Sequence, residues 1–167
     1  MTRPVPTSKE LSFEDNEFIV SKTDLKGKIT YGNELFIRIS GYAEHELLHT
    51  PHNILRHPDM PKTVFWKLWD EIQKGNEVFA YVKNLTKNGD FYWVYAQVTP
   101  SFDKDNNIIG YHSVRRRPGR EQVKKVEALY TKLLNAEKSG GLNAGKELLE
   151  NVLKKEGKQY DEFIFTL

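Results

Sequence analysis

Residues 78–115 read VFAYVKNLTKNGDFYWVYAQVTPSFDKDNNIIGYHSVR, and this stretch decides the fold. It contains three runs rich in aromatic and β-branched residues, which favour strands. The turn Thr86–Asp90 contains Asn-Gly, the strongest short signal for a hairpin, and the turn Asp103–Asn107 is rich in Asp and Asn. The predicted strands are Val78–Leu85, Phe91–Ser101 and Ile108–Arg115. We therefore predict a three-stranded antiparallel meander.

The residues before the meander predict two more strands and a set of helices. Glu17–Thr23 and Ile29–Tyr31 read as a hairpin around the turn residues Asp24–Lys28. The predicted helices are a short one from the N-cap Asn33 to Ile39 that Gly41 ends, a second over Ala43–Leu48, and the longest over Lys62–Gln73. Five antiparallel strands with short helices on one face make an α+β domain, in which short packed helices wall a cavity.

The segment Pro51–Pro61, PHNILRHPDMP, is the candidate functional site. Its three prolines limit any helix to about one turn, because proline fixes φ and restricts the residue before it. The segment also supplies a guanidinium, two imidazoles, an amide and a carboxylate, which suit a polar ligand. The structural alternative is a surface turn rich in Pro and Asp.

The two ends of the chain differ from the middle. Residues 1–13 hold prolines and small polar residues, and we expect a flexible arm with little to bury. Residues 118–167 predict a helical extension that Gly140-Gly141 divides. Its first helix carries an apolar stripe, which packs either on the sheet or on another chain. The stripe comprises Val123, Val126, Leu129, Tyr130, Leu133 and Leu134.

Composition excludes several classes of protein. The chain has 25 basic and 23 acidic residues, so its charge of +2 predicts no general affinity for nucleic acid. The run Arg115–Arg117 is expected to be solvated or paired. The sequence has no cysteine, which excludes thiolate metal sites and suits a reducing compartment. No segment approaches the roughly 18 apolar residues of a membrane span, so we expect a cytoplasmic protein without direct membrane insertion.

From about Glu14 to Arg117 the chain resembles a PAS domain, and in particular the PAS domains of bacterial aerotaxis receptors. The motifs that carry the resemblance are Asn33–Phe36, Ser40–Tyr42, Pro51–Pro61, Phe65, Trp69, Val82–Asn84, Lys87–Gly89 and Tyr92–Trp93. The resemblance implies a PAS sensor domain over residues 14–117. Because the chain has no membrane anchor or receptor signalling module, it is also similar to stand-alone energy-taxis PAS proteins of the CetB type.

The resemblance implies FAD as the cofactor. It assigns Arg56 to a phosphate or other polar part, His57 as a hydrogen-bond donor, and Asp59 as an orienting carboxylate. The other residues it implies are Asn84 for the pyrimidine edge of the flavin, Trp69, Phe79 and Trp93 for the ring, and His52, Asn53 and Asn33 as weaker candidates. Phe79 stands where the receptor pattern has tryptophan. Each polar residue also has a structural alternative, such as the N-cap role of Asn33.

The resemblance also implies a redox or energy sensor that is not an enzyme, and we expect it to signal in trans to a membrane-bound chemoreceptor-like partner, with a homodimer as a companion possibility. The predicted exits for the signal are the outer face of Val78–Val114 and the stripe Val126, Leu129, Leu133. Two alternatives stay open: a PAS interaction scaffold with another ligand or none, and a metal site or hydrolase built on His52, His57 and Asp59.

Overall fold

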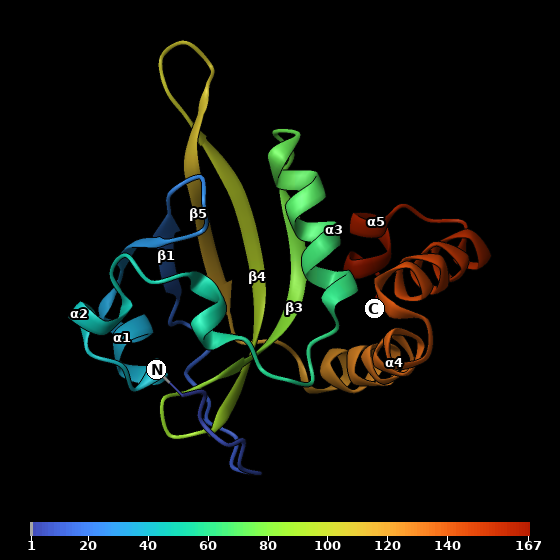
Figure 1. Ribbon diagram of the computed structural model, residues 1–167, viewed down its shortest axis with the longest axis horizontal. Coiled ribbons are helices and arrows are strands. Elements are labelled where there is room, and N and C mark those ends of the chain that lie inside the picture. Colours follow the sequence, from blue (N-terminus) through green and yellow to red (C-terminus); the bar gives the residue numbers. More distant parts are fainter. Residues whose placement is uncertain (1) are drawn as a thin grey trace.

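The computed structural model describes residues 2–167 and contains a five-stranded antiparallel sheet (Figure 1). The strands are β1 Ile19–Thr23, β2 Ile29–Gly32, β3 Val78–Leu85, β4 Phe91–Phe102 and β5 Ile108–Arg116. Their order is β2-β1-β5-β4-β3, so the N-terminal hairpin joins the meander through pairing of β1 with β5. The predicted α+β fold with a five-stranded antiparallel sheet is confirmed.

Four helical segments connect β2 to β3 and lie over one face of the sheet, which we call the inner face. They are α1 Glu34–Ser40, α2 Glu44–Leu47, the 3-10 helix η1 His52–Leu55, and α3 Lys62–Gln73. The sequence signals for α1 are confirmed, because the Asn33 side chain accepts a hydrogen bond from the Phe36 N–H and Gly41 ends the helix at φ 77°. As predicted, the prolines limit η1 to one turn.

Residues alternate between the two faces along each strand. On the inner face, the pairs Val82↔Val94 and Asn84↔Tyr92 join β3 to β4. On the other face, which we call the outer face, Tyr81↔Tyr95 and Lys83↔Trp93 are paired. The two faces of the meander therefore carry different sets of aromatic residues.

The C-terminal helices pack on the outer face. They are α4 Arg120–Glu156, which is kinked where Gly141 adopts φ 71° and ψ −166°, and α5 Tyr160–Phe165. Tyr130 of α4 donates a hydrogen bond to the Tyr81 carbonyl and stacks with Trp93 at a ring-centroid distance of 6.2 Å. The predicted break at Gly140-Gly141 is confirmed. In residues 2–167, no helix has the length and apolar content needed to cross a membrane.

The apolar stripe of α4 is buried by its own chain. Val126 and Leu133 are 0% exposed, and Leu129 is partly buried against the same core. The expectation that Val126, Leu129 and Leu133 form an exposed surface for a partner is therefore wrong. The reason is that the aromatic outer face of β3 and β4 supplies an apolar surface within the chain, so the stripe is covered without a partner.

The two halves of α4 also contact α3. Glu137 accepts hydrogen bonds from the backbone N–H groups of Lys62 and Thr63, both at 2.9 Å, and from the Thr63 hydroxyl at 2.7 Å. Pro61, the N-cap of α3, offers no side-chain hydrogen bond, so Glu137 takes the place of a local cap. Beyond the kink, Gly145 approaches so closely that a Cβ there would lie 2.1 Å from Thr63 Oγ1.

The N-terminal arm lies against the sheet. The Thr7 N–H donates to the Gly89 carbonyl at 2.9 Å, and the Leu11 N–H donates to the Phe91 carbonyl at 2.7 Å. Phe13 is 6% exposed and belongs to the core. The expectation of a flexible arm with little to bury thus differs from the structure, since backbone pairing to the start of β4 holds the arm in place.

Candidate functional site

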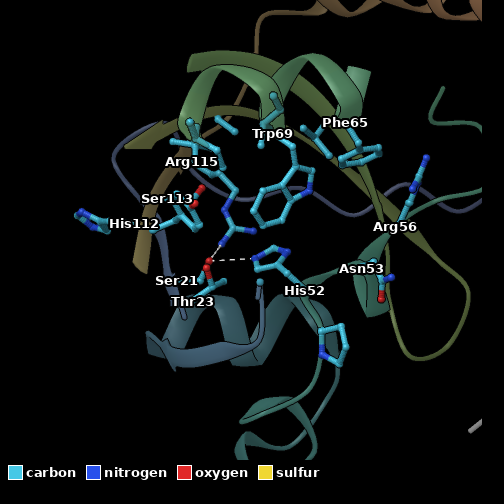
Figure 2. Close-up of a pocket in the computed structure, with 18 of the residues that line it drawn as sticks. Ser21, Thr23, His52, Asn53, Arg56, Phe65, Trp69, His112, Ser113 and Arg115 are labelled. Carbon is cyan, nitrogen blue, oxygen red and sulfur yellow. Dashed lines mark hydrogen bonds between the residues drawn. The ribbon is translucent and has the colours of Figure 1, made fainter. Parts of the chain in front are cut away.

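A cavity of about 370 Å³ lies between the inner face of the sheet and the helices η1 and α3 (Figure 2). Its size is within the range of small-molecule and cofactor sites, which is about 300–1,000 Å³. The residues that matter for its chemistry are Ser21, His52, Asn53, Arg56, Phe65, Leu68, Trp69, Ile72, Asn84, Tyr111 and Arg115. The predicted cavity between short helices and sheet is present.

Helix α3 supplies the apolar wall. Phe65, Leu68, Trp69 and Ile72 recur at intervals of three and four residues, so they lie on one helical face and point toward the sheet. The Trp69 ring meets Tyr111 of β5 edge to face, with 5.5 Å between ring centroids. This wall presents flat aromatic surface to a ligand.

The β1–β2 turn closes the cavity beside Trp69. Gly27 adopts φ 79°, and a Cβ at this position would lie 3.1 Å from the indole ring. Only glycine permits both this backbone conformation and this close approach without strain. The turn and the tryptophan therefore define one edge of the cavity together.

A polar cluster of Ser21, His52 and Arg115 also lines the cavity, where the three side chains point toward one another (Figure 2). Arg115 Nη2 donates a hydrogen bond to Ser21 Oγ, and Ser21 Oγ lies 3.1 Å from His52 Nε2. Because the hydroxyl accepts from Arg115, its proton is available for His52 Nε2.

Burial controls the charges of this cluster. Burial, followed by the nearby Arg115 charge, lowers the pKa of His52 to about 3, so His52 is neutral at physiological pH. Burial also lowers the pKa of Arg115 to about 10, which still leaves the guanidinium charged at pH 7. Arg115 is 3% exposed, and no Asp or Glu side chain of residues 2–167 forms an ion pair with it. Its guanidinium carbon lies 5.0 Å from the centroid of the Phe36 ring, but a buried cation without an anion is costly, which makes Arg115 a candidate ligand-binding group.

The cavity also contains hydrogen-bonding groups without partners. Arg115 Nε and Asn84 Nδ2 have no hydrogen-bond partner among residues 2–167, and both residues line the cavity. The Tyr92 hydroxyl, opposite Asn84 on the same face, makes no hydrogen bond of ordinary geometry to any residue from 2 to 167; burial raises its pKa to about 12, and the neighbouring Asn84 amide opposes this shift. Buried donors in native proteins are nearly always satisfied. The cavity thus offers donors to a ligand that carries acceptor atoms.

The cavity mouth lies at the end of η1. Arg56 stacks over the Phe65 ring with its guanidinium carbon 4.2 Å from the ring centroid. Backbone pairing of Arg56 with Asn84 fixes this end of η1 to β3. In Figure 2 the Arg56 side chain lies away from the Ser21–His52–Arg115 cluster, beside Asn53. The site therefore has separate cationic groups at its interior and at its mouth.

The structure brings five of the sequence-predicted residues together at this cavity. They are His52, Asn53, Arg56, Trp69 and Asn84. The other five, His57, Asp59, Asn33, Phe79 and Trp93, lie elsewhere, and each has a structural reason for its position.

His57 and Asp59 lie at the edge of the sheet beside β3. His57 is 3% exposed, its Nδ1 accepts a hydrogen bond from the Asp59 N–H at 3.0 Å, and its ring meets Phe91 edge to face. The Asp59 carboxylate accepts from Lys83 Nζ at 2.9 Å, and this bond lowers the pKa of Asp59. These contacts match the alternative of a network that holds the proline-rich loop. They also separate His57 and Asp59 from His52, so the three do not form the combined site considered for metal or hydrolytic chemistry.

Asn33, Phe79 and Trp93 are occupied by packing. Asn33 caps α1, accepts from the Val20 N–H at 3.1 Å, and donates to the Phe18 carbonyl at 2.8 Å. Phe79 and Trp93 are on the outer face, where Phe79 contacts Phe165 of α5 at a centroid distance of 4.6 Å. The prediction that Phe79 and Trp93 line the ring site is wrong for this cavity, because the sheet separates them from it.

Sequence reasoning missed Ser21 and Arg115. The run Arg115–Arg117 was expected to be solvated or paired, and this holds for Arg116 and Arg117, which are exposed, but not for Arg115. The alternation of β5 carries the signal: Tyr111, Ser113 and Arg115 share the inner face, opposite to Val114 and Arg116. A strand period of two would have placed Arg115 toward the core.

Comparisons with known proteins agree with this architecture. Residues 29–115 match the family model described as the PAS fold. The chain is 42% identical over 135 residues to the aerotaxis receptor of Escherichia coli K12, covering 81% of the chain and 26% of the receptor. It is 24% identical over 103 residues to a nitrogen fixation regulatory protein of Klebsiella pneumoniae, covering 62% of the chain and 21% of that protein. The chain thus spans about a quarter or less of the length of these relatives.

Solved structures of light-oxygen-voltage domains share the fold. A domain studied with a flavin analogue superposes with a TM-score of 0.60 at 20% identity, over 65% of this chain and 82% of that one. The dark structure of the Aureochrome1 blue-light photoreceptor domain gives 0.59 at 21% identity, over 71% and 86% of the two chains. With the strand order, the inserted helices and the family match, these findings show that the chain belongs to the PAS fold family.

Proposed function

We propose that this protein is a flavin-dependent redox or energy sensor whose cofactor is FAD. The observation that carries the proposal is an aromatic cavity that contains the buried Arg115 guanidinium, which has no acidic partner, and the Asn84 amide, whose nitrogen has no hydrogen-bond partner among residues 2–167. The 42% identity to an aerotaxis receptor supports it independently. A flavin ring has flat apolar faces and a polar edge of alternating donors and acceptors, which is the chemistry this cavity complements.

The residues divide into three roles. Trp69 and Phe65 would form the apolar slot for the ring, and Asn84 would pair with its polar edge. Arg56, at the mouth, would bind a phosphate group. Arg115 would face whichever part of the ring gains negative charge, because it is the buried cation of the cavity.

FAD, when bound, would supply reversible electron uptake. The Arg115 guanidinium would then stabilise the negative charge that the ring gains, and its hydrogen bond to Ser21 on β1 would compete with its hydrogen bond to the ligand. Since Ser21 also contacts His52 of η1, a change at Arg115 reaches β1 and η1 directly. Such a redistribution of hydrogen bonds is a physical basis for two signalling states.

The signal would leave through the part of the outer face that α4 and α5 leave uncovered. Phe18 and Tyr31, near β1 and on β2, are 45% and 46% exposed there. Two exposed aromatic side chains on the outer face, above strands that line the cavity, suit contact with a partner. We propose that this partner is a membrane-bound chemoreceptor-like protein, reached in trans, and that the chain itself performs no catalysis.

Hydrogen exchange of the FAD-loaded protein, oxidised and reduced with dithionite, tests the sensor. We expect altered protection in β1, β5 and η1, and equal protection in both states would refute the redox sensor.

Phe18→Ser with Tyr31→Ser should retain FAD yet abolish gathering of the source organism in an oxygen gradient. Exposed Ile109→Ser, far from this face on the β4–β5 hairpin, is the matched control. A normal response in the double variant would refute the proposed exit.

A further inference from the structure

The cavity mouth carries a second guanidinium that comes from the N-terminal arm. Arg3 Nη2 donates a hydrogen bond to the Asn53 carbonyl at 2.8 Å. The backbone N–H of Arg56 donates to the same carbonyl at 3.0 Å. One carbonyl oxygen thus anchors two arginine residues that are 53 positions apart in the chain. Asn53 and Arg56 line the cavity, whereas Arg3 lies outside its lining.

The fold determines the position of Arg3. Thr7 is held to the turn before β4 through its N–H, which bonds Gly89, and through its hydroxyl, which donates to Asp90 at 2.6 Å. Pro4 and Pro6 stiffen the chain between Thr7 and Arg3. The arm passes so close to the turn that a Cβ on Gly89 would lie 2.0 Å from the Val5 carbonyl oxygen. The arm is therefore seated on the fold along the length that leads to Arg3.

The two cations have no acidic partner. Neither Arg3 nor Arg56 takes part in an ion pair among residues 2–167. The Arg56 guanidinium stacks on Phe65 and donates no hydrogen bond to residues 2–167. Its N–H edge is therefore open to a ligand. Burial and then the Arg3 charge lower the pKa of Arg56, while the Glu137 charge opposes this. Two like charges held at one rim favour an anion between them.

We infer that Arg3 and Arg56 form a two-arginine clamp for the diphosphate of a flavin dinucleotide and so select FAD over FMN and riboflavin. The inference rests on the proposed flavin function. Arg56, at the cavity lining, would bind the phosphate that FMN and FAD both carry. Arg3, further out, would bind the second phosphate, which only the dinucleotide has. A planar guanidinium is suited to such phosphate contacts.

Fluorescence titrations of flavin-free protein with riboflavin, FMN and FAD test the clamp. Arg3→Ala should raise the Kd for FAD by about tenfold, the size of one exposed charge-assisted hydrogen bond, and leave FMN and riboflavin unchanged. Arg56→Ala should weaken FMN and FAD but not riboflavin. Lys104→Ala, in the distant β4–β5 turn, removes the same charge and should change none of the three. Arg3 is exposed, so the unfolding temperature of Arg3→Ala should equal that of the wild type.

The outcomes separate the two proposals. If the wild type binds FAD and Arg3→Ala binds it equally well, the clamp is refuted and the flavin function stands. If Arg3→Ala weakens all three flavins to the same degree, Arg3 acts on the shape of the cavity and not on the second phosphate, which also refutes the clamp. A wild-type protein that binds none of the three flavins overturns the proposed function and the clamp together.

Discussion

Replacing Arg115 with methionine is expected to stabilise the ligand-free protein and to weaken its binding of FAD. The guanidinium is 3% exposed, and burial lowers its pKa from 12.5 to about 10. That difference corresponds to about 3 kcal/mol of unfavourable free energy in the folded state at neutral pH. Methionine has a similar length and no charge, so the substitution removes this cost without opening a large cavity.

The gain is partly offset by lost contacts. The charged hydrogen bond from Arg115 to Ser21 stabilises the fold by about 1.5 kcal/mol, while Ser21 keeps His52 as a partner. The net stabilisation is then about 1.5 kcal/mol, or about 3–6 °C in unfolding temperature for a chain of this size. FAD affinity should fall by about 10–100-fold, because a charge-assisted bond to the ligand is lost.

Thermal and urea unfolding without flavin, together with FAD titration, measures both effects. Arg116→Met is the matched control, since Arg116 follows directly on the same strand but is exposed on the opposite face. The control should change neither stability nor affinity by a measurable amount. An Arg115→Met protein that is less stable than the wild type and binds FAD normally would refute the reasoning, because Arg115 would then be a structural residue.

Three further predictions concern the helices and the pH dependence. In urea denaturation, Glu137→Ala should lower the free energy of unfolding by about 1–2 kcal/mol, because it leaves the α3 N-terminus uncapped. The control Glu127→Ala, at an exposed position, should change it by under about 0.5 kcal/mol. Equal effects of the two substitutions would contradict the capping role. Leu133→Asp should prevent folding as judged by circular dichroism, because it places a charge at a position that is 0% exposed. A variant that folds but associates differently would show instead that α4 is a surface for a partner. The pKa of His52 is about 3 when folded against 6.5 when unfolded, so the unfolded state binds the extra proton and stability falls as pH drops from about 6.5 toward 3. Unfolding at stepwise pH should show a shallower fall in His52→Gln than in exposed His45→Gln, and identical slopes would contradict a neutral, partly buried His52.

The sequence carried clear signals for the elements but not for the faces of the sheet. Caps and turns predicted α1 and the β3–β4 hairpin correctly, because Asn33, Gly41 and Asn88-Gly89 act through local backbone geometry. Phe79 and Trp93 were misplaced because β3 and β4 are covered on both faces. When both faces of a strand are apolar, composition does not reveal which face lines a cavity.

Arg115 was missed for a different reason. A basic run at a strand end is usually solvated, but the alternation of β5 places Arg115 on the inner face with Tyr111 and Ser113, and its contact with Ser21 depends on the pairing of β5 with β1. That pairing joins residues 94 positions apart, which local patterns do not encode. In contrast, Arg56 and His52 were found because the prolines mark their loop as stiff and irregular.

The central claim is that the cavity lined by Trp69, Asn84 and Arg115 holds FAD. The most direct measurement is the absorbance spectrum of purified wild-type protein, followed by chromatography of the flavin that denaturation releases. The account predicts a flavin spectrum with close to one FAD per chain. Because the sequence has no cysteine, illumination should leave that spectrum free of the reversible bleaching that a thiol adduct causes. Colourless protein that fails to take up added FAD would contradict the account.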